Sequence, residues 1–294
     1  MGIIINLTKR NTLMFLKDKS AVFFSFLSVI IIIGLYVVFL ENNNIKAVQK
    51  LMQVDRKMVA YLVNSWVLAG IVIVNSVTVT LGVLGIMVDD EAENRMPSFL
   101  VSPAGRWQLT LGYIISAFVV GNVLCTITFV LSQAYILISG GSLLGSFQIL
   151  KALGIIIISV FSSTCFVFFI VSLIRSRNAF STASTIIGTV IGFVTGIYIP
   201  IGELPQMVQK FIKCVPAFYG SSLMRDTFME DPVSKVFNGA PSNVISSYLE
   251  TSGVKIVWNS TVTDFEKTAV VIISGVVFMA LSVLVMRNRR ISRV

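Results

Sequence analysis

The stretch Trp66–Val88, WVLAGIVIVNSVTVTLGVLGIMV, carries no Asp, Glu, Lys or Arg. Crossing a bilayer core about 30 Å thick as a helix takes about 20 mainly apolar residues. A helix on the surface of a soluble protein keeps a charged face toward water, and this stretch has none. It therefore predicts a membrane-spanning helix, which ends where the charged residues begin at Asp89 and Asp90.

The rest of the chain has the composition of a membrane protein. Of its 294 residues, 55% are hydrophobic and only 13% are charged, whereas a soluble domain carries roughly 25% charged residues. We expect six membrane-spanning helices, at residues 21–40, 66–88, 112–138, 150–174, 180–199 and 268–286. The predicted fold class is an all-α membrane protein, with residues 1–294 forming one transmembrane domain.

The N-terminal residues 3–17 are apolar but interrupted by Lys9, Arg10 and Lys17. That is too much charge for a membrane span. An amphipathic helix in the headgroup plane would place these basic residues against lipid phosphate, and a short disordered tail is the alternative.

The net charge of +9 sits mainly near the ends of the apolar runs. Lys and Arg accumulate in cytoplasmic loops and contact anionic lipid, so their distribution places both termini in the cytoplasm. No basic stripe is interleaved with aromatic residues, which argues against nucleic acid as a partner. We expect a multi-pass protein of the cell membrane, specifically a bacterial plasma membrane.

The sequence lacks the residues that several kinds of chemistry require. The chain has no His and three scattered Cys, which removes the commonest general base and zinc ligand, so we expect no catalytic residue and no metal site. No G-x-x-x-x-G-K-[ST] phosphate loop occurs, so we expect no cofactor in this chain, and ATP and Mg would bind a partner. The spans 21–40 and 66–88 lack the ionisable groups that ion-coupled carriers use, so any energy for transport must come from another protein.

The longest segment between spans, residues 200–267, falls outside the cell in this topology. Its part 203–218 has apolar residues at helical spacing, which predicts a re-entrant helix that dips into the outer leaflet and packs on protein. The polar part, about 230–267, could form a small external subdomain.

The segment 89–106 between spans two and three is the richest cytoplasmic feature. It opens with acids, and arginines and a short apolar ridge at Phe99 follow. Acids favour the N-terminal end of a helix through its dipole, so we expect a helix here that docks into a groove of a cytosolic partner. A solvated connecting loop is the alternative.

Two sets of residues resemble ABC-2-type transporter permeases. The cytoplasmic set, similar to that family's coupling segment, includes Asp90, Glu91, Arg95, Pro103 and Arg106. The external set resembles the family's extracellular signature and contains Pro200, Glu203, Leu204, Pro205, Val208, Ile212, Pro216, Tyr219, Leu223 and Arg225.

The resemblance implies that two permease subunits, identical or related, pair around a central pathway above two separate ATP-binding subunits. Residues of 89–106, among them Phe99, would contact the ATPase. Spans two and five would line the dimer interface, which makes the pathway candidates Asn75, Ser76, Thr78, Thr80, Thr185 and Thr189. The same small hydroxyl residues also mediate ordinary helix packing, and that reading stays open.

The expected function is therefore the membrane subunit of an ATP-driven exporter. The expected cargo is hydrophobic or amphipathic: a drug, a lipid-linked molecule or an antimicrobial peptide. A non-transporting membrane sensor or scaffold that uses segment 200–267 is the alternative, and a membrane-embedded enzyme is disfavoured.

Overall fold

The computed structural model describes residues 2–35, 45, 49, 54–93, 95, 106–174, 176–258 and 260–288. Within these ranges the regular secondary structure is helical, apart from one isolated bridge between Val257 and Thr261. The helices are α1 (Gly2–Lys17), α2 (Lys19–Leu35), α4 (Arg56–Ala92), α6 (Arg106–Ile138), α7 (Ser146–Leu173), α8 (Arg177–Val194), the short 3₁₀ helix η2 (Ile201–Glu203), α9 (Gln206–Ile212), α10 (Pro216–Val236), α11 (Ser242–Thr251) and α12 (Asp264–Asn288).

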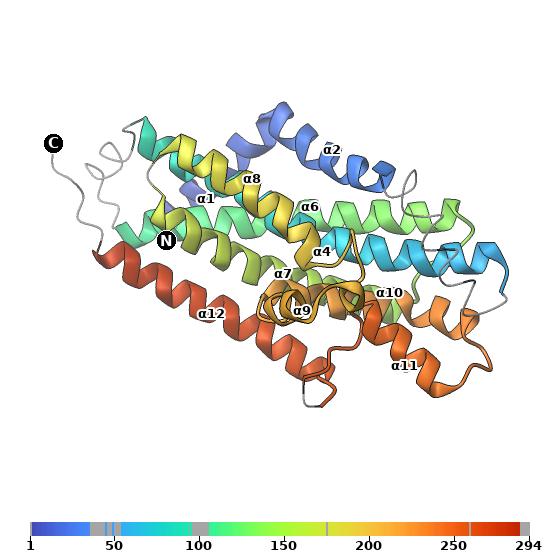
Figure 1. Cartoon of the computed structure of the whole chain (residues 1–294). Helices are drawn as coiled ribbons and strands as arrows, with labels where there is room; N and C mark the ends of the chain where they lie inside the picture. Colours follow the sequence, from blue (N-terminus) through green and yellow to red (C-terminus); the bar gives the residue numbers. More distant parts are fainter. Residues whose placement is uncertain are drawn as a thin grey trace.

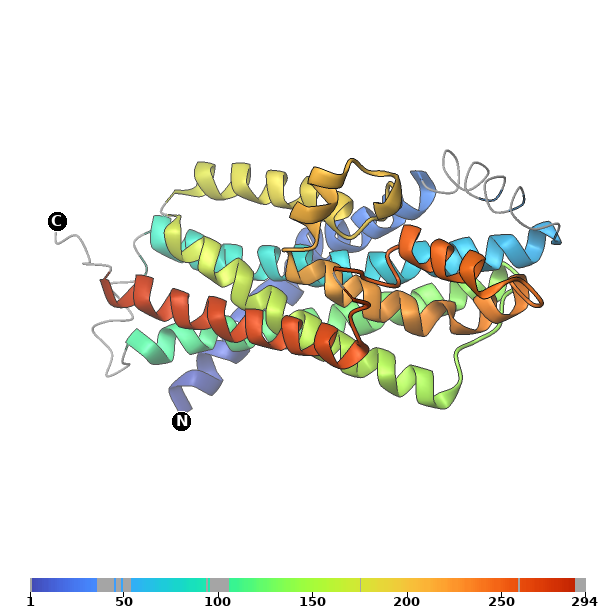
Figure 2. The same ribbon diagram turned by 60° about the horizontal axis from the view of Figure 1, so that its bottom comes forward.

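The long helix α4 forms the centre of an elongated bundle (Figure 1). It packs against α6, α7 and α10, and α12 covers α7. Most of its side chains are buried all around the helix, as a helix that is apolar on every side requires. Figure 2 shows that α4 and α12 end, and α8 begins, at one end of the bundle, which we call the hub end. The opposite end carries α11.

Four helices, α4, α6, α7 and α12, are long and apolar enough to cross a membrane. They contain the predicted spans 66–88, 112–138 and 268–286 in full and all but the last residue of 150–174. The span predicted at 21–40 corresponds to α2, which is described only to Leu35, and the span predicted at 180–199 corresponds to α8. The count of six spans, of which these two are part, remains a prediction.

The helix in the region of span five is shorter than the predicted span. Helix α8 ends at Val194, five residues early. Gly196 follows with a φ of 69°, the Ile197 N–H donates to the Gly192 carbonyl at 3.1 Å, and the Gly196 N–H donates to the Phe193 carbonyl at 3.0 Å. This is the Schellman pattern, in which a left-handed residue after the helix satisfies its last carbonyls.

The N-terminal helix exists, and α1 is part of the bundle. It buries Leu7, Asn11 and Phe15, which share one face because they are four residues apart. Two glycines make room for it: a Cβ at Gly112 of α6 would lie 2.7 Å from the Leu7 Cβ, and one at Gly82 of α4 would lie 3.2 Å from the Phe15 ring. The alternative of a disordered tail is thereby excluded.

The region 203–218 contains the start of more than one helix, and the re-entrant position predicted for it remains a prediction. The segment forms α9, breaks at residues 213–215, and resumes as α10 at Pro216. Proline suits the first position of a helix, where no N–H is needed. Helix α10 then runs into the bundle against α4, and Phe237, Val254 and Ile256 join the same buried core. Described residues beyond 230 therefore contribute to the core of the bundle.

Candidate functional site

A cluster of charged side chains joins four helices at the hub end. Its centre is Asp90 in the last turn of α4, whose side chain is 0% exposed. The two terminal nitrogens of Arg10 donate to its two carboxylate oxygens at 2.8 and 2.9 Å. The Tyr113 hydroxyl of α6 donates to Oδ2 at 2.6 Å. Arg95 adds a longer contact at 3.5 Å. A buried carboxylate is tolerated only when it is paired in this way.

The outer part of the cluster brings in helix α8. Arg177, the first residue of α8, donates to Asp89 at 2.7 Å and pairs with Glu93. Glu93 also pairs with Arg95. We call Arg10, Asp89, Asp90, Glu93, Arg95, Tyr113 and Arg177 the charge hub. Through it, α1, α6 and α8 are all tied to the end of α4.

The hub corrects one expectation about segment 89–106. Its acids lie at the C-terminal end of α4, and not at the start of a new helix. Negative charge is unfavourable at a helix C-terminus because of the helix dipole. The arginines at positions 10, 95 and 177 supply the compensating positive charge.

Electrostatics keep Asp90 ionised. Burial by itself raises the pKa of Asp90, but the hydrogen bonds from Arg10 and Tyr113 outweigh it, so the pKa lies below its usual value. The same hydrogen bond to Asp90 raises the pKa of Arg10, against the lowering effect of burial. Both groups are therefore charged at neutral pH.

The six predicted coupling residues have different surroundings. Asp90 faces the interior, whereas the Arg95 side chain is about half exposed. Glu91 lies in the last turn of α4 and is partly buried. Arg106 begins α6. Phe99 and Pro103 lie outside the described residues. Sequence reasoning missed Arg10, Tyr113 and Arg177 as hub partners. The only available signal was that each is polar and lies at an end of an apolar run.

The pathway candidates on α4 face neighbouring helices of the same chain. The Asn75 amide donates to the Thr128 hydroxyl of α6 at 2.7 Å, and the hydroxyls of Ser76 and Ser163 of α7 lie 2.8 Å apart. Thr80 is buried and donates to its own helix, as does the partly buried Thr78. In this conformation Asn75 and Ser76 join α4 to α6 and α7, whereas the hydrogen bonds of Thr78 and Thr80 stay within α4.

The candidates on α8 lie on an open face. Thr185 and Thr189 are exposed, and each hydroxyl donates to the carbonyl four residues earlier in α8. A Cβ at Gly188 would meet nothing within 4 Å. The apolar neighbours Ile186, Val190 and Phe193 are exposed as well. Within the described chain, α8 thus packs on α4 with one side and leaves a small-residue face uncovered at the edge of the bundle (Figure 2).

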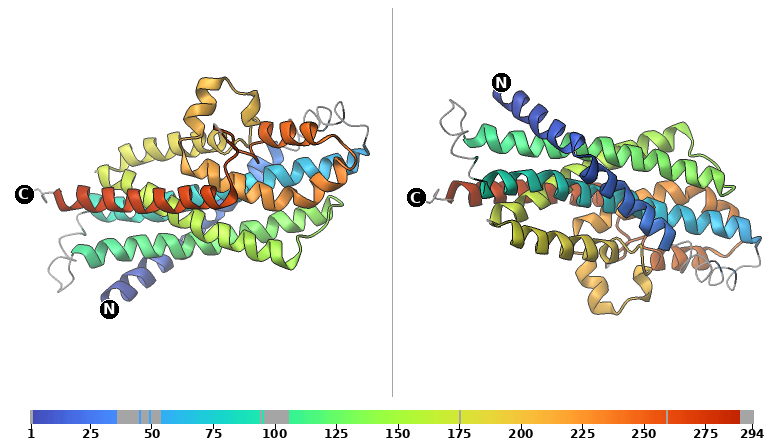
Figure 3. Two further views of the ribbon diagram at one scale, coloured as in Figure 1. Left: turned by 90° about the horizontal axis from the view of Figure 1, so that it is seen from below. Right: turned by 90° about the horizontal axis from the view of Figure 1, so that it is seen from above.

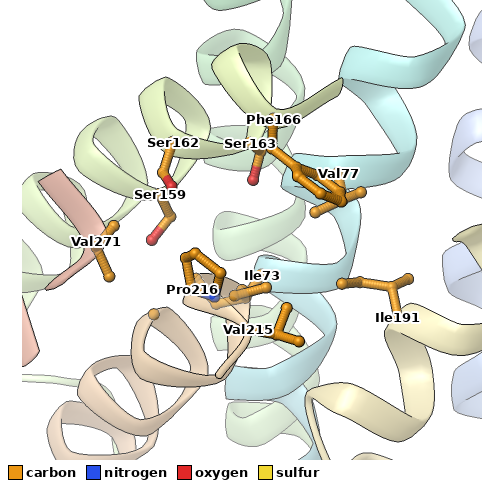
Figure 4. A pocket seen from close by; sticks show the side chains of 12 residues that line it. Ile73, Val77, Ser159, Ser162, Ser163, Phe166, Ile191, Val215, Pro216 and Val271 are labelled. Atoms are coloured by element: carbon orange, nitrogen blue, oxygen red, sulfur yellow. The ribbon is translucent and has the colours of Figure 1, made fainter. Parts of the chain in front are cut away.

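A small cavity lies where α10 begins, between α4, α7, α8 and α12 (Figure 4). Its volume is about 20 Å³, enough for about one water molecule. The Ser159 hydroxyl points into it, close to Pro216, and has no hydrogen-bond partner in the described chain. The cavity is a mainly apolar gap in the packing with three serines on its wall, and it is far too small to be a passage for cargo.

Toward the opposite end, Arg225 of α10 is completely buried against α4. Its Nε donates to the Trp66 carbonyl at 3.4 Å, and its Nη1 donates to the Ser252 carbonyl at 3.3 Å. Its guanidinium carbon lies 4.8 Å from the centre of the Trp66 ring, a cation–π contact. Gly196 leaves space beside it, since a Cβ there would lie 3.3 Å from Nη1. Arg225 therefore fixes α10 and the turn after α11 to the start of α4.

The other residues of the external set shape the same region. Pro200, Pro205 and Pro216 stand at the starts of η2, α9 and α10. Tyr219 is buried and accepts a hydrogen bond from the Trp258 ring nitrogen at 3.2 Å. The prolines set the breaks in the chain, and Tyr219 and Arg225 secure the pieces between them.

At the α11 end, Asp231 of α10 forms a second polar network that sequence reasoning did not identify. Lys235, Ser142 and Tyr61 donate to its Oδ2 at 2.7, 2.7 and 3.1 Å. Nearby, Lys151 of α7 bridges Asp226 and Asp264 at 3.0 and 3.3 Å. These contacts hold α10 to the ends of α4, α7 and α12.

Comparison with known protein families finds a match over more than half of the chain. The family described as ABC-2 type transporter matches residues 4–229, which include most of α1, the whole charge hub and most of α10. No individual curated protein matches the chain significantly.

Proposed function

This chain belongs to the ABC-2 type transporter family, and on that premise we propose that it is the permease subunit of an ATP-driven exporter. Membership makes it a multi-pass membrane component of an ABC transporter that works with an ABC ATP-binding subunit. We further propose that the hub end is cytoplasmic, that the permease acts as a dimer, and that the cargo is hydrophobic or amphipathic.

The charge hub is the observation that supports this function most directly. It stands at the start of segment 89–106, and its ion pairs tie α1, α4, α6 and α8 together at that point. A push on this segment by an ATPase would therefore move four helices together. Transport requires the helices to switch between two packed arrangements, and packed helices shift as units when they do so.

The charge hub divides the proposed coupling residues into two groups with different roles. Glu91 and the half-exposed Arg95 are proposed to contact the ATPase, together with Phe99, Pro103 and Arg106. Asp90 is fully buried, so its proposed role is to hold α4 in place relative to the other three helices. Loss of Asp90 would then uncouple transport without removing a contact to the partner.

The open face of α8 supports pairing with a second permease. Small residues let helices approach closely in lipid, and Thr185, Gly188 and Thr189 form such a face with space beside it. The small internal cavity offers no route through one chain in this conformation. We therefore propose that the pathway forms between two chains and that Thr185 and Thr189 line it. The candidates on α4 would stabilise the helix packing around it.

The coupling proposal is tested by replacing Glu91 and Arg95 with Ala. Both variants should insert normally, but co-purification of the co-expressed ATP-binding subunit and ATP-dependent uptake of a lipophilic dye into inverted vesicles should fall. Glu203→Ala and Lys210→Ala, exposed charge removals outside segment 89–106, are the controls and should change neither. Unchanged ATPase association in the Glu91 and Arg95 variants would overturn the assigned role.

A further inference from the structure

A polar cleft of about 200 Å³ lies beside α9, apart from the charge hub and the α8 face. It is lined by residues of η2, α9, α11 and the start of α10, together with Lys213, Lys255 and Val257. Its charged lining residues are Lys213, Glu250 and Lys255, and Gln209 and Ser247 add polar atoms. Two cations and one anion in so small a space point to a charged ligand.

Both lysines are held in place and still have donors to spare. The Lys213 ammonium donates to the Val257 carbonyl at 2.7 Å, and the Lys255 ammonium donates to the Ser246 hydroxyl at 3.1 Å. An ammonium group has three N–H donors, so each bond leaves two donors for an anion. Lys213 is further fixed over the Trp258 ring, 5.8 Å from its centre.

Exposed apolar side chains on α9 and at Trp258 suit the surface of a lipid leaflet. Met207 and Phe211 of α9 are 85% and 64% exposed, and Trp258 is 51% exposed. Figure 3 shows the segment that contains α9 projecting sideways from the bundle. Exposed apolar residues on a short helix insert at the boundary of headgroups and acyl chains, and Trp concentrates at the same level. The lysines then lie where lipid phosphates lie.

Glu250 adds a second requirement on the ligand. Its side chain is exposed at the cleft, and within the described chain it forms no ion pair. A phosphate alone would be repelled by this carboxylate, whereas a phosphate followed by an ammonium group would satisfy both signs of charge.

We propose that this cleft binds the phosphoethanolamine headgroup of a phospholipid, with its phosphate on Lys213 and Lys255 and its ammonium on Glu250. The acyl chains then pass along Met207 and Phe211. Assignment to the outer leaflet rests on the proposed function, but the binding itself requires neither transport nor an ATPase.

Native mass spectrometry of the detergent-solubilised full chain tests the site. The probes are phosphatidylethanolamine, phosphatidylglycerol and soluble glycerophosphoethanolamine. The ethanolamine lipid should bind at least tenfold more tightly than the other two. Lys213→Gln and Lys255→Gln should each weaken it about tenfold, Lys213→Arg should retain it, and Glu250→Gln should remove the preference over phosphatidylglycerol.

Lys210→Gln is the matched control, because Lys210 is an exposed residue of α9 that does not line the cleft. Equal weakening by Lys210→Gln would show non-specific attraction and overturn the site. Equally tight binding of soluble glycerophosphoethanolamine would overturn the lipid as its source. The assay contains no ATP-binding subunit, so a failure to bind lipid leaves the transport proposal intact. A failure of the transport experiment likewise leaves the lipid-binding proposal intact.

Discussion

Arg10 and Asp90, 80 positions apart in the chain, form a two-point ion pair at 2.8 and 2.9 Å in which the carboxylate is fully buried. The pair fastens the N-terminal helix to the end of the central helix. The N-terminal helix is therefore part of the proposed coupling apparatus.

Removal of one partner of this pair should be strongly destabilising. Arg10→Gln would leave Asp90 buried without its main cation, a change that costs about 3–5 kcal/mol in proteins. Thermal unfolding in detergent, followed by circular dichroism, should show a clear loss. The double variant Arg10→Gln/Asp90→Asn should recover part of it, and Lys9→Gln, on the exposed neighbour, should change little. Equal stability of Arg10→Gln and the wild type would contradict the role of the hub.

The Asn75–Thr128 bond distinguishes packing from substrate contact. If the bond serves packing, Asn75→Ala, Thr128→Ala and the double variant should give a coupling energy of about 0.6–2 kcal/mol. Unfolding in detergent measures this cycle, and the ratio of transport rates for two different cargo compounds should stay constant. A changed ratio with no coupling energy would show instead that Asn75 contacts cargo.

Gly196 should not tolerate a side chain. Gly196→Ala would force Ala to a φ near 69° and bring its Cβ to 3.3 Å from Arg225 Nη1. The left-handed conformation alone costs about 1–2 kcal/mol. Gly154→Ala is the control, since that position lies within α7 with nothing within 4 Å of a Cβ. It should be neutral or stabilising by up to about 1 kcal/mol. Both are measured by thermal unfolding, and equal effects would refute the strain argument.

The Asp231 network predicts a pH dependence. Burial raises the pKa of Asp231, but the hydrogen bonds from Lys235, Ser142 and Tyr61 lower it by a larger amount. The folded-state pKa is therefore below its usual value. A carboxyl group whose pKa is lowered by folding stabilises the folded state at pH values above its unfolded pKa of about 3.9. That stabilisation is lost as the pH falls through the folded-state pKa. Asp231→Asn should therefore cost about 0.5–1 kcal/mol at pH 7. In unfolding measurements that cost should shrink steadily below pH 4, and a cost that grew on acidification would have the wrong sign.

The orientation is testable with single cysteines in a background in which Cys125, Cys165 and Cys214 are replaced. Ala240→Cys lies in the turn before α11 and should react with a membrane-impermeant maleimide on intact cells. Ser98→Cys should react only after the cells are opened. The opposite labelling pattern would invert the proposed topology.

The sequence predicted the framework well, because the thickness of a bilayer translates directly into the length of an apolar run. The runs around Trp66–Val88 and Gly112–Ile138 each form a single long helix. Their ends were harder to predict, since local geometry decides them. The break at Gly196 depends on two backbone hydrogen bonds and a left-handed residue, which an apolar run through Ile199 conceals.

The long apolar runs of the sequence by themselves determined that the chain is a helical membrane protein. Only the tertiary structure decided where its polar side chains point. Asp90 follows a span in sequence, yet it is buried because Arg10 and Tyr113, far away in the chain, meet it there. Asn75 faces α6, whereas Thr185 faces outward. The reason is physical: burial in lipid depends on the average apolarity of a segment, whereas a polar contact depends on which helix packs on which face.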